Sequence, residues 1–140
     1  MEAILSRAFS AARLAMLLQF LRFGTVGTIG FVVDTSIVYA IKGSVGLYAA
    51  GAVSFVVAAT VTWGLNRIWT FRGSGSGPMH RQWALFLTTN MLGFMLNRGA
   101  YFTLITVSVL CVQYPVLATA GGAVMGMFLN FYLNRTVVFR

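Results

Sequence analysis

Apolar residues run along this chain in four long stretches, near residues 23–41, 47–65, 83–107 and 116–133. A helix of about 20 apolar residues crosses a hydrocarbon core of about 30 Å, and each stretch is close to that length. A backbone in lipid must satisfy its own hydrogen bonds, so we interpret all four stretches as helices. The third is long enough to tilt or to extend past the membrane. The pattern predicts an all-α membrane protein with four transmembrane helices.

The first 20 residues show a different pattern, in which apolar and polar side chains fall on separate faces of a helix. One face is apolar and another is polar: Leu5, Phe9, Ala12, Met16 and Phe20 against Ser6, Ser10 and Arg13. This predicts an amphipathic helix in residues 1–20 that lies on the membrane surface, followed by a transmembrane domain in residues 21–140. A signal peptide fits less well, because Arg22 ends the apolar run and no clear cleavage context follows.

The second and fourth stretches end alike. Residues 66–72 read NRIWTFR and residues 134–140 read NRTVVFR, at an offset of 68. The same offset relates two stripes of small or polar residues at every fourth position: Ala50, Ser54, Ala58, Thr62 and Asn66, and then Ala118, Gly122, Gly126, Asn130 and Asn134. Such stripes let helix backbones approach closely, and their hydroxyls and amides can bond between helices. Packing is the simplest role for them.

The first and third stretches correspond at an offset of 63. Phe23, Thr25, Gly30, Phe31 and Asp34 line up with Phe86, Thr88, Gly93, Phe94 and Asn97. Each repeat then holds two spans, so both copies face the same way. We predict two parallel two-helix repeats related by an axis along the membrane normal. The segment 73–78, GSGSGP, has the composition of a flexible loop and also resembles an engineered linker.

Composition and charge agree with a membrane protein. Only 9% of the residues are charged and 59% are hydrophobic, whereas a soluble domain carries roughly 25% charged residues. The net charge of +8 suggests membrane orientation rather than a nucleic-acid partner, because the basic residues gather at the ends of the apolar stretches. One side of the membrane receives eight arginines, and Lys42 lies on the other: Arg7, Arg13, Arg22, Arg67, Arg72, Arg81, Arg135 and Arg140. The positive-inside rule predicts that both termini are cytoplasmic.

Few residues are suited to catalysis. The single cysteine, Cys111, and the single histidine, His80, make a metal site within the chain very improbable. The sequence contains no Ser/His/Asp set and no phosphate-binding glycine loop of the Walker type. We expect no metal, no cofactor and no enzymatic activity.

Two charged residues lie at membrane depth. Asp34 is 11 residues beyond Phe23, roughly 16 Å along a helix and near the midplane. Arg98 lies one position after Asn97, the counterpart of Asp34. The simplest interpretation is an ion pair between Asp34 and Arg98; the functional one is that Arg98 binds an anionic headgroup. Asn90 and Asn97 share a helical face and are candidates to line a polar groove.

Arg67 and Arg135 end the second and fourth stretches, each after an asparagine, Asn66 or Asn134. A lone arginine at such a position usually reaches towards lipid phosphates, with aromatic residues as interfacial anchors. Two copies in a repeated setting also suggest a shared phosphate site. The candidate substrate-binding residues are therefore Asp34, Asn66, Arg67, Asn90, Asn97, Arg98, Asn134 and Arg135.

These residues resemble those of a known family. Phe20-Leu21-Arg22-Phe23 with Gly24, Gly27, Gly30 and Asp34, the motif Asn66-Arg67-x-Trp69-Thr70-Phe71, and the closing Phe131 to Arg135 with Phe139 are similar to the GtrA-like family over about residues 20–140. The resemblance implies a four-span bacterial inner-membrane protein that moves polyprenyl-phosphate-linked sugars outward for cell-envelope polysaccharide synthesis. An outward-facing glycosyltransferase then uses the sugar. Val137 and Val138 replace Trp69 and Thr70 in the second copy, so the resemblance does not imply equal use of both copies.

Three functions are compatible with this pattern. The first is translocation of the lipid-linked sugar, with a homodimer or larger assembly expected because four helices form a thin wall around a groove. The second is a membrane scaffold that recruits a glycosyltransferase, which has little need of Asp34 and Arg98 at mid-depth. The third is a small proton-coupled efflux transporter, for which the tandem Asn-Arg endings are atypical and Arg98 is unfavourable to cationic drugs.

Overall fold

The computed structural model describes the backbone of residues 2–75 and 77–140, and their side chains except those of residues 2–9, 47, 115 and 116. The elements in order are α1 (Glu2–Leu65), the π-helical turn η1 (Asn66–Thr70), α2 (Met79–Val107), α3 (Val109–Gln113), α4 (Pro115–Leu133) and the π-helical turn η2 (Asn134–Val138). No strand occurs among these residues, so the all-α prediction is confirmed for them. The chain divides into two compact units, Met1–Ser74 and Gly75–Arg140, which we describe separately.

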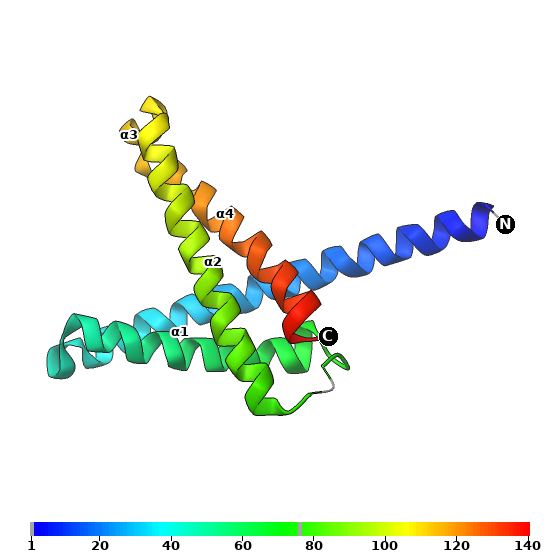
Figure 1. Ribbon diagram of the computed structural model, residues 1–140, viewed down its shortest axis with the longest axis horizontal. Helices are drawn as coiled ribbons and strands as arrows, with labels where there is room; N and C mark the ends of the chain where they lie inside the picture. Colours follow the sequence, from blue (N-terminus) through cyan, green and yellow to red (C-terminus); the bar gives the residue numbers. More distant parts are fainter. Residues whose placement is uncertain (1, 76) are drawn as a thin grey trace. The chain divides into compact units, whose positions relative to one another are not determined.

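Unit 1 is a helical hairpin made from α1. The helix is broken at Gly46, whose φ of 80° and ψ of 164° lie outside the helical region. Glycine adopts such a positive φ without a steric penalty, which places the bend here. The two limbs of α1 run back along each other from this bend (Figure 1). They contain the first two predicted spans, 23–41 and 47–65.

No helix break marks the boundary predicted at residue 20. The first limb is one continuous helix from Glu2 towards Gly46, since neither glycine nor proline interrupts residues 2–22. The side chains of Leu5, Ser6, Arg7 and Phe9 lie outside the described residues, while Leu14 and Leu17 are exposed. An interfacial position for residues 1–20 stays a prediction.

Unit 2 is a second hairpin, formed by α2 and α4. These helices lie side by side, and the short α3 occupies the turn between them (Figure 1). The Ser108 hydroxyl caps α3 by accepting a hydrogen bond from the Cys111 amide at 3.4 Å. The helix bounds are close to the predicted stretches 83–107 and 116–133, and α2 begins four residues earlier than predicted.

The stripes of small and polar residues form the inner face of each hairpin. All five positions of the first stripe are buried, and so are four of the five in the second, with Asn130 half-buried. Gly30 lies directly against the Thr62 side chain in unit 1, and Gly93 lies against the Asn130 side chain in unit 2. These contacts join residues that correspond at offsets of 63 and 68, so both hairpins use the same close approach.

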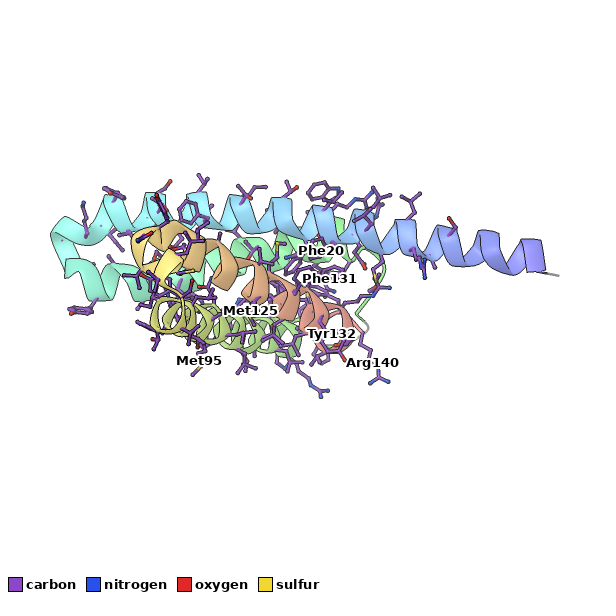
Figure 2. The ribbon with its side chains drawn as sticks, turned by 90° about the horizontal axis from the view of Figure 1, so that it is seen from above. Phe20, Met95, Met125, Phe131, Tyr132 and Arg140 are labelled. Atoms are coloured by element: carbon purple, nitrogen blue, oxygen red, sulfur yellow. The ribbon has the colours of Figure 1, made fainter. Side chains whose placement is uncertain are left out.

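The outer faces of both hairpins are apolar. Met95 and Tyr132, labelled in Figure 2, are each 63% exposed, and Phe31 is 71% exposed. Polar side chains such as Ser54 and Asn66 are buried instead, an arrangement typical of helices that pack within lipid. Among the described residues, the segments Ser10–Gly46 and Tyr48–Thr70 are long and apolar enough to cross a membrane.

Candidate functional site

Each hairpin ends in a π-helical turn at its Asn-Arg pair. The carbonyl of Asn66 accepts a hydrogen bond from the Phe71 amide at 2.8 Å, and the carbonyl of Asn134 accepts one from the Phe139 amide at 2.9 Å. The residues that close the turns have nearly equal backbone angles, φ −114° and ψ 35° at Phe71 and φ −108° and ψ 35° at Phe139. Hydrogen bonds of this i to i+5 type are rare and frequently occur at functional sites.

An aromatic pair fastens each turn to the first helix of its own hairpin. The rings of Phe23 and Phe71 meet edge to face at 6.1 Å, and those of Phe86 and Phe139 meet in the same way at 6.2 Å. All four side chains are buried. Such a pair contributes about 0.5–1.5 kcal/mol beyond the burial of its area. The two turns are therefore held by equivalent contacts.

The asparagines of the repeated ending lie inside the hairpins. Asn66 is 2% exposed and Asn134 is fully buried. The side-chain amide of Asn134 donates to the carbonyl of Asn130 at 2.7 Å. The side-chain oxygens of Asn66 and Asn134 have no hydrogen-bond partner within the described residues. Both predicted site residues are thus interior groups with an unused acceptor.

The end of unit 1 carries additional cationic and aromatic groups. Arg67 follows Asn66 and is half-buried. The Arg22 guanidinium lies 5.9 Å from the centre of the Trp69 ring, and Trp69 is 42% exposed. The side-chain amide of Gln19 donates to the carbonyl of Thr70 at 3.3 Å. We call this group the first rim: Gln19, Arg22, Asn66, Arg67, Trp69 and Thr70.

The end of unit 2 differs from the first rim at particular positions. Arg135 is exposed and corresponds to Arg67. At the repeat offset of 63, however, Leu85 occupies the position that corresponds to Arg22. At the offset of 68, Val137 occupies the position that corresponds to Trp69. A cation stacked on an aromatic ring is therefore a feature of the first rim that these positions of unit 2 do not reproduce.

The charged residues at membrane depth belong to different units. Asp34 is half-buried on α1, and Arg98 is exposed on α2, where its guanidinium lies 5.3 Å from the centre of the Phe94 ring. Residues 75–140 contain no acidic residue, so Arg98 has no carboxylate partner within its own unit. The predicted pairing of Asp34 with Arg98 stays a prediction.

Asn90 and Asn97 are both half-buried on α2. The side-chain amide of Asn90 donates to the carbonyl of Phe86 at 2.8 Å, within its own helix. Asn97 packs with its backbone and side chain against Gly122 on α4. The structure thus places Asn97 in the contact between the two helices, and the role of these residues in a polar groove stays a prediction.

A separate cavity of about 620 Å³ lies open between α2 and α4. Its lining is almost wholly apolar: Leu96, Gly99, Ala100, Thr103, Leu104, Ala120, Gly121, Val124 and Met125. The hydroxyl of Thr103 donates to the carbonyl of Gly99 at 2.9 Å, which satisfies the one polar side chain of the lining. None of the predicted site residues lines this cavity.

Several members of the first rim were missed by sequence reasoning as site residues. Gln19 and Gln82 correspond at the offset of 63, and each precedes the phenylalanine of an aromatic pair by four residues. Extending the repeat four residues towards the N-terminus would have found them. Gln82 is 3% exposed. The described residues contain no cluster of three or more His, Cys, Asp or Glu side chains that could hold a metal ion.

Comparison with known proteins identifies the domain. The family model of the GtrA/DPMS transmembrane domain matches residues 22–139. The match includes both hairpins and both π-helical turns, and it begins after the stretch predicted to be amphipathic. A search of curated proteins found no match.

Proposed function

The chain belongs to the GtrA/DPMS transmembrane family, and on that premise we propose that it moves a polyprenyl-phosphate-linked sugar across the bacterial inner membrane for cell-envelope polysaccharide synthesis. The family itself indicates a membrane protein of glycan or lipid-linked sugar metabolism. The observation that carries the proposal is the first rim, where two arginines and an exposed tryptophan gather at one end of a helical hairpin.

The proposed topology has four spans, arranged as two parallel two-helix repeats with both termini in the cytoplasm. Support comes from the equivalent aromatic pairs, π-helical turns and buried stripes of the two hairpins. The excess of arginine at the hairpin ends supports the orientation. Both hairpin ends then lie at the cytoplasmic face, where the lipid-linked sugar is made.

The chemistry of the first rim suits a phosphate-linked headgroup. A guanidinium offers paired donors that match the oxygens of a phosphate, and Arg22 and Arg67 supply two of them. The Trp69 ring offers an apolar face beside Arg22. The polyprenyl chain stays in the bilayer throughout, so the protein has to carry only the headgroup through an apolar medium. No bond is made or broken, and we propose no enzymatic activity for this chain.

We propose that Asp34 and Arg98 are polar groups that the lipid headgroup contacts as it crosses the membrane. A charge at the centre of a membrane helix costs on the order of 3 kcal/mol on insertion scales, so each requires a partner or a role. An anionic headgroup passing Arg98 supplies the counter-charge that unit 2 lacks. We further propose that the protein works as a homo-oligomer, and that a glycosyltransferase consumes the sugar on the outer side.

A reconstituted translocation assay tests the function. The native chain is placed in vesicles with a polyprenyl phosphosugar, and the outward movement of the sugar is followed with a membrane-impermeant reagent. We expect Arg67→Ala to slow translocation at least tenfold and the matched Arg135→Ala to slow it less, since Arg67 shares its π-helical turn with Trp69, which contacts Arg22, whereas unit 2 has Val137 and Leu85 at the corresponding positions. Native vesicles that move no more lipid than empty ones would refute the proposal. If such a chain still binds a glycosyltransferase, it is a scaffold.

A further inference from the structure

Thr70 is an exception among the helical threonines. The hydroxyls of Thr25, Thr60 and Thr136 each donate to the carbonyl four residues earlier, at 2.7–3.0 Å. The hydroxyl of Thr70 is buried in a side chain only 4% exposed, and it has no hydrogen-bond partner within the described residues. Thr70 lies in the π-helical turn in which the Asn66 carbonyl accepts from the Phe71 amide.

A second unused group lies in the same turn. The Asn66 side-chain oxygen is also buried and also lacks a hydrogen-bond partner in the described part of the chain. Residues four positions apart lie on the same side of a helical turn, so Asn66 and Thr70 are neighbours. Buried polar atoms are nearly always hydrogen-bonded, and an unsatisfied pair indicates a missing partner. The amide oxygen accepts and the hydroxyl both donates and accepts, which together fit one O–H group.

Unit 2 has the same backbone without this pair. Val138 occupies the place of Thr70, is 5% exposed, and sits in a turn whose closing angles are nearly those of unit 1. The chain therefore contains both a threonine and a valine version of one π-helical turn. The valine version shows that the turn forms without the hydroxyl, so the hydroxyl of Thr70 is not needed to build it.

We propose that the Asn66 side-chain oxygen and the Thr70 hydroxyl bind a hydroxyl group of the sugar on the lipid-linked substrate. The inference rests on the proposed function and assigns a specificity site within it. The arginines of the first rim hold the phosphate, and Asn66 and Thr70 recognise the sugar. The sugar O–H donates to the Asn66 oxygen, and the Thr70 hydroxyl donates to the sugar oxygen. Unit 2, which has Val138 at this position, forms the same turn but does not bind the sugar hydroxyl.

Access to the pair requires the turn to loosen. The Gln19 side-chain amide donates to the Thr70 carbonyl at 3.3 Å, slightly longer than the usual distance for an N–H donor. Trp69, the residue before Thr70, is already 42% exposed. A sugar that displaces the Gln19 contact therefore reaches the two buried groups from the exposed side of the first rim. Recognition of the sugar and opening of the turn are then one event.

The test compares two classes of lipid, with and without a sugar, on the full chain in nanodiscs. Binding of polyprenyl phosphate is measured beside binding of polyprenyl phosphosugars that carry glucose, mannose or arabinose. The native chain should bind at least one phosphosugar roughly tenfold more tightly than the bare phosphate. Thr70→Val should abolish that difference and leave the affinity for bare polyprenyl phosphate unchanged. Thr70→Ser should restore it, because serine keeps the hydroxyl. Val138→Thr, the matched control in unit 2, should change neither affinity.

Each other outcome overturns the inference. Equal binding of bare and glycosylated lipids by the native chain means that no sugar site exists, even if translocation is observed. An equal loss of both affinities in Thr70→Val assigns the hydroxyl to phosphate binding or to structure. An unchanged ratio in Thr70→Val shows that the Thr70 hydroxyl does not recognise the sugar. The proposed function fails separately, when the native chain moves no lipid in vesicles.

Discussion

The close approach of α2 and α4 can be tested at Gly122, in the buried stripe of unit 2. A Cβ added at Gly122 would overlap the backbone carbonyl oxygen of Asn97. The neighbouring stripe residue gives the scale, since a Cβ at Gly126 would lie 2.9 Å from the carbonyl oxygen of Gly93. Carbon and oxygen atoms in such contacts normally stay about 3.3–3.6 Å apart. An alanine at Gly122 therefore forces the helices apart by at least several tenths of an ångström.

The net energetic cost combines two penalties with one gain. Overpacking of a tight contact costs about 1–3 kcal/mol, because a backbone carbonyl cannot rotate away as a side chain can. Alanine recovers about 1 kcal/mol of helix propensity relative to glycine. If the added methyl group opens a gap of about 0.5–1 Å between α2 and α4, the neighbouring atoms of the two helices also lose about a quarter to a half of their dispersion energy. We expect Gly122→Ala to destabilise the protein by about 1–2 kcal/mol in net terms.

The assay is reversible unfolding of the purified protein in detergent, with Gly99→Ala as the control. Gly99 lies in the same unit, and a Cβ there would meet no atom within 4 Å. Gly99→Ala should be neutral or should stabilise by up to about 1 kcal/mol, the helix-propensity term alone. If Gly122→Ala proves as stable as Gly99→Ala, the two helices do not approach as closely as the structure shows.

Two further predictions concern the aromatic pairs and Arg98. Phe71→Ala and Phe139→Ala should each destabilise by roughly 3–5 kcal/mol in the same unfolding assay, since each removes a buried ring and its edge-to-face partner; a loss below about 1 kcal/mol in either contradicts the role given to the pairs. Arg98→Gln should change the free energy of unfolding by less than about 1 kcal/mol, because the contact of Arg98 in unit 2 is an exposed stacking on the Phe94 ring. It should slow translocation at least tenfold in the vesicle assay, and undiminished transport would remove Arg98 from the path.

The hairpins were largely predictable from sequence because their inner faces are periodic. The stripe that runs from Ala50 to Asn66 recurs at an offset of 68, and burial confirms that it faces inward in unit 1. The bend at Gly46 falls in the short interval between the first two predicted spans. The ends of α2 and α4 agree with the predicted stretches to within four residues, whereas α1 begins at Glu2 and has no break at residue 20. The periodic pattern of apolar and small residues was therefore enough to predict the two helices of each hairpin.

The π-helical turns could not be predicted in the same way. Their i to i+5 bonds differ from ordinary helical bonds by one residue, and no composition signal distinguishes the two. Asn66 and Asn134 were expected both in the packing stripes and beside the arginines of a phosphate site, and their burial agrees with the stripes. The hydroxyl of Thr70, in the first of these turns, has no hydrogen-bond partner within the described residues. The proposed site therefore includes a turn whose backbone departs from the regular helix that sequence periodicity describes.

Comparing the two hairpins distinguishes the structural features that they share from the residues that differ between them. Buried stripes, aromatic pairs and π-helical turns are present in both hairpins, so these features do not distinguish the two hairpin ends. The positions that differ, Arg22 against Leu85, Trp69 against Val137 and Thr70 against Val138, all lie at those ends. Because the closing backbone angles of the two turns agree within a few degrees, these differences alter chemistry and not shape. Exchanging Thr70 and Val138 is therefore a chemical experiment on one hydroxyl, carried out within a single chain.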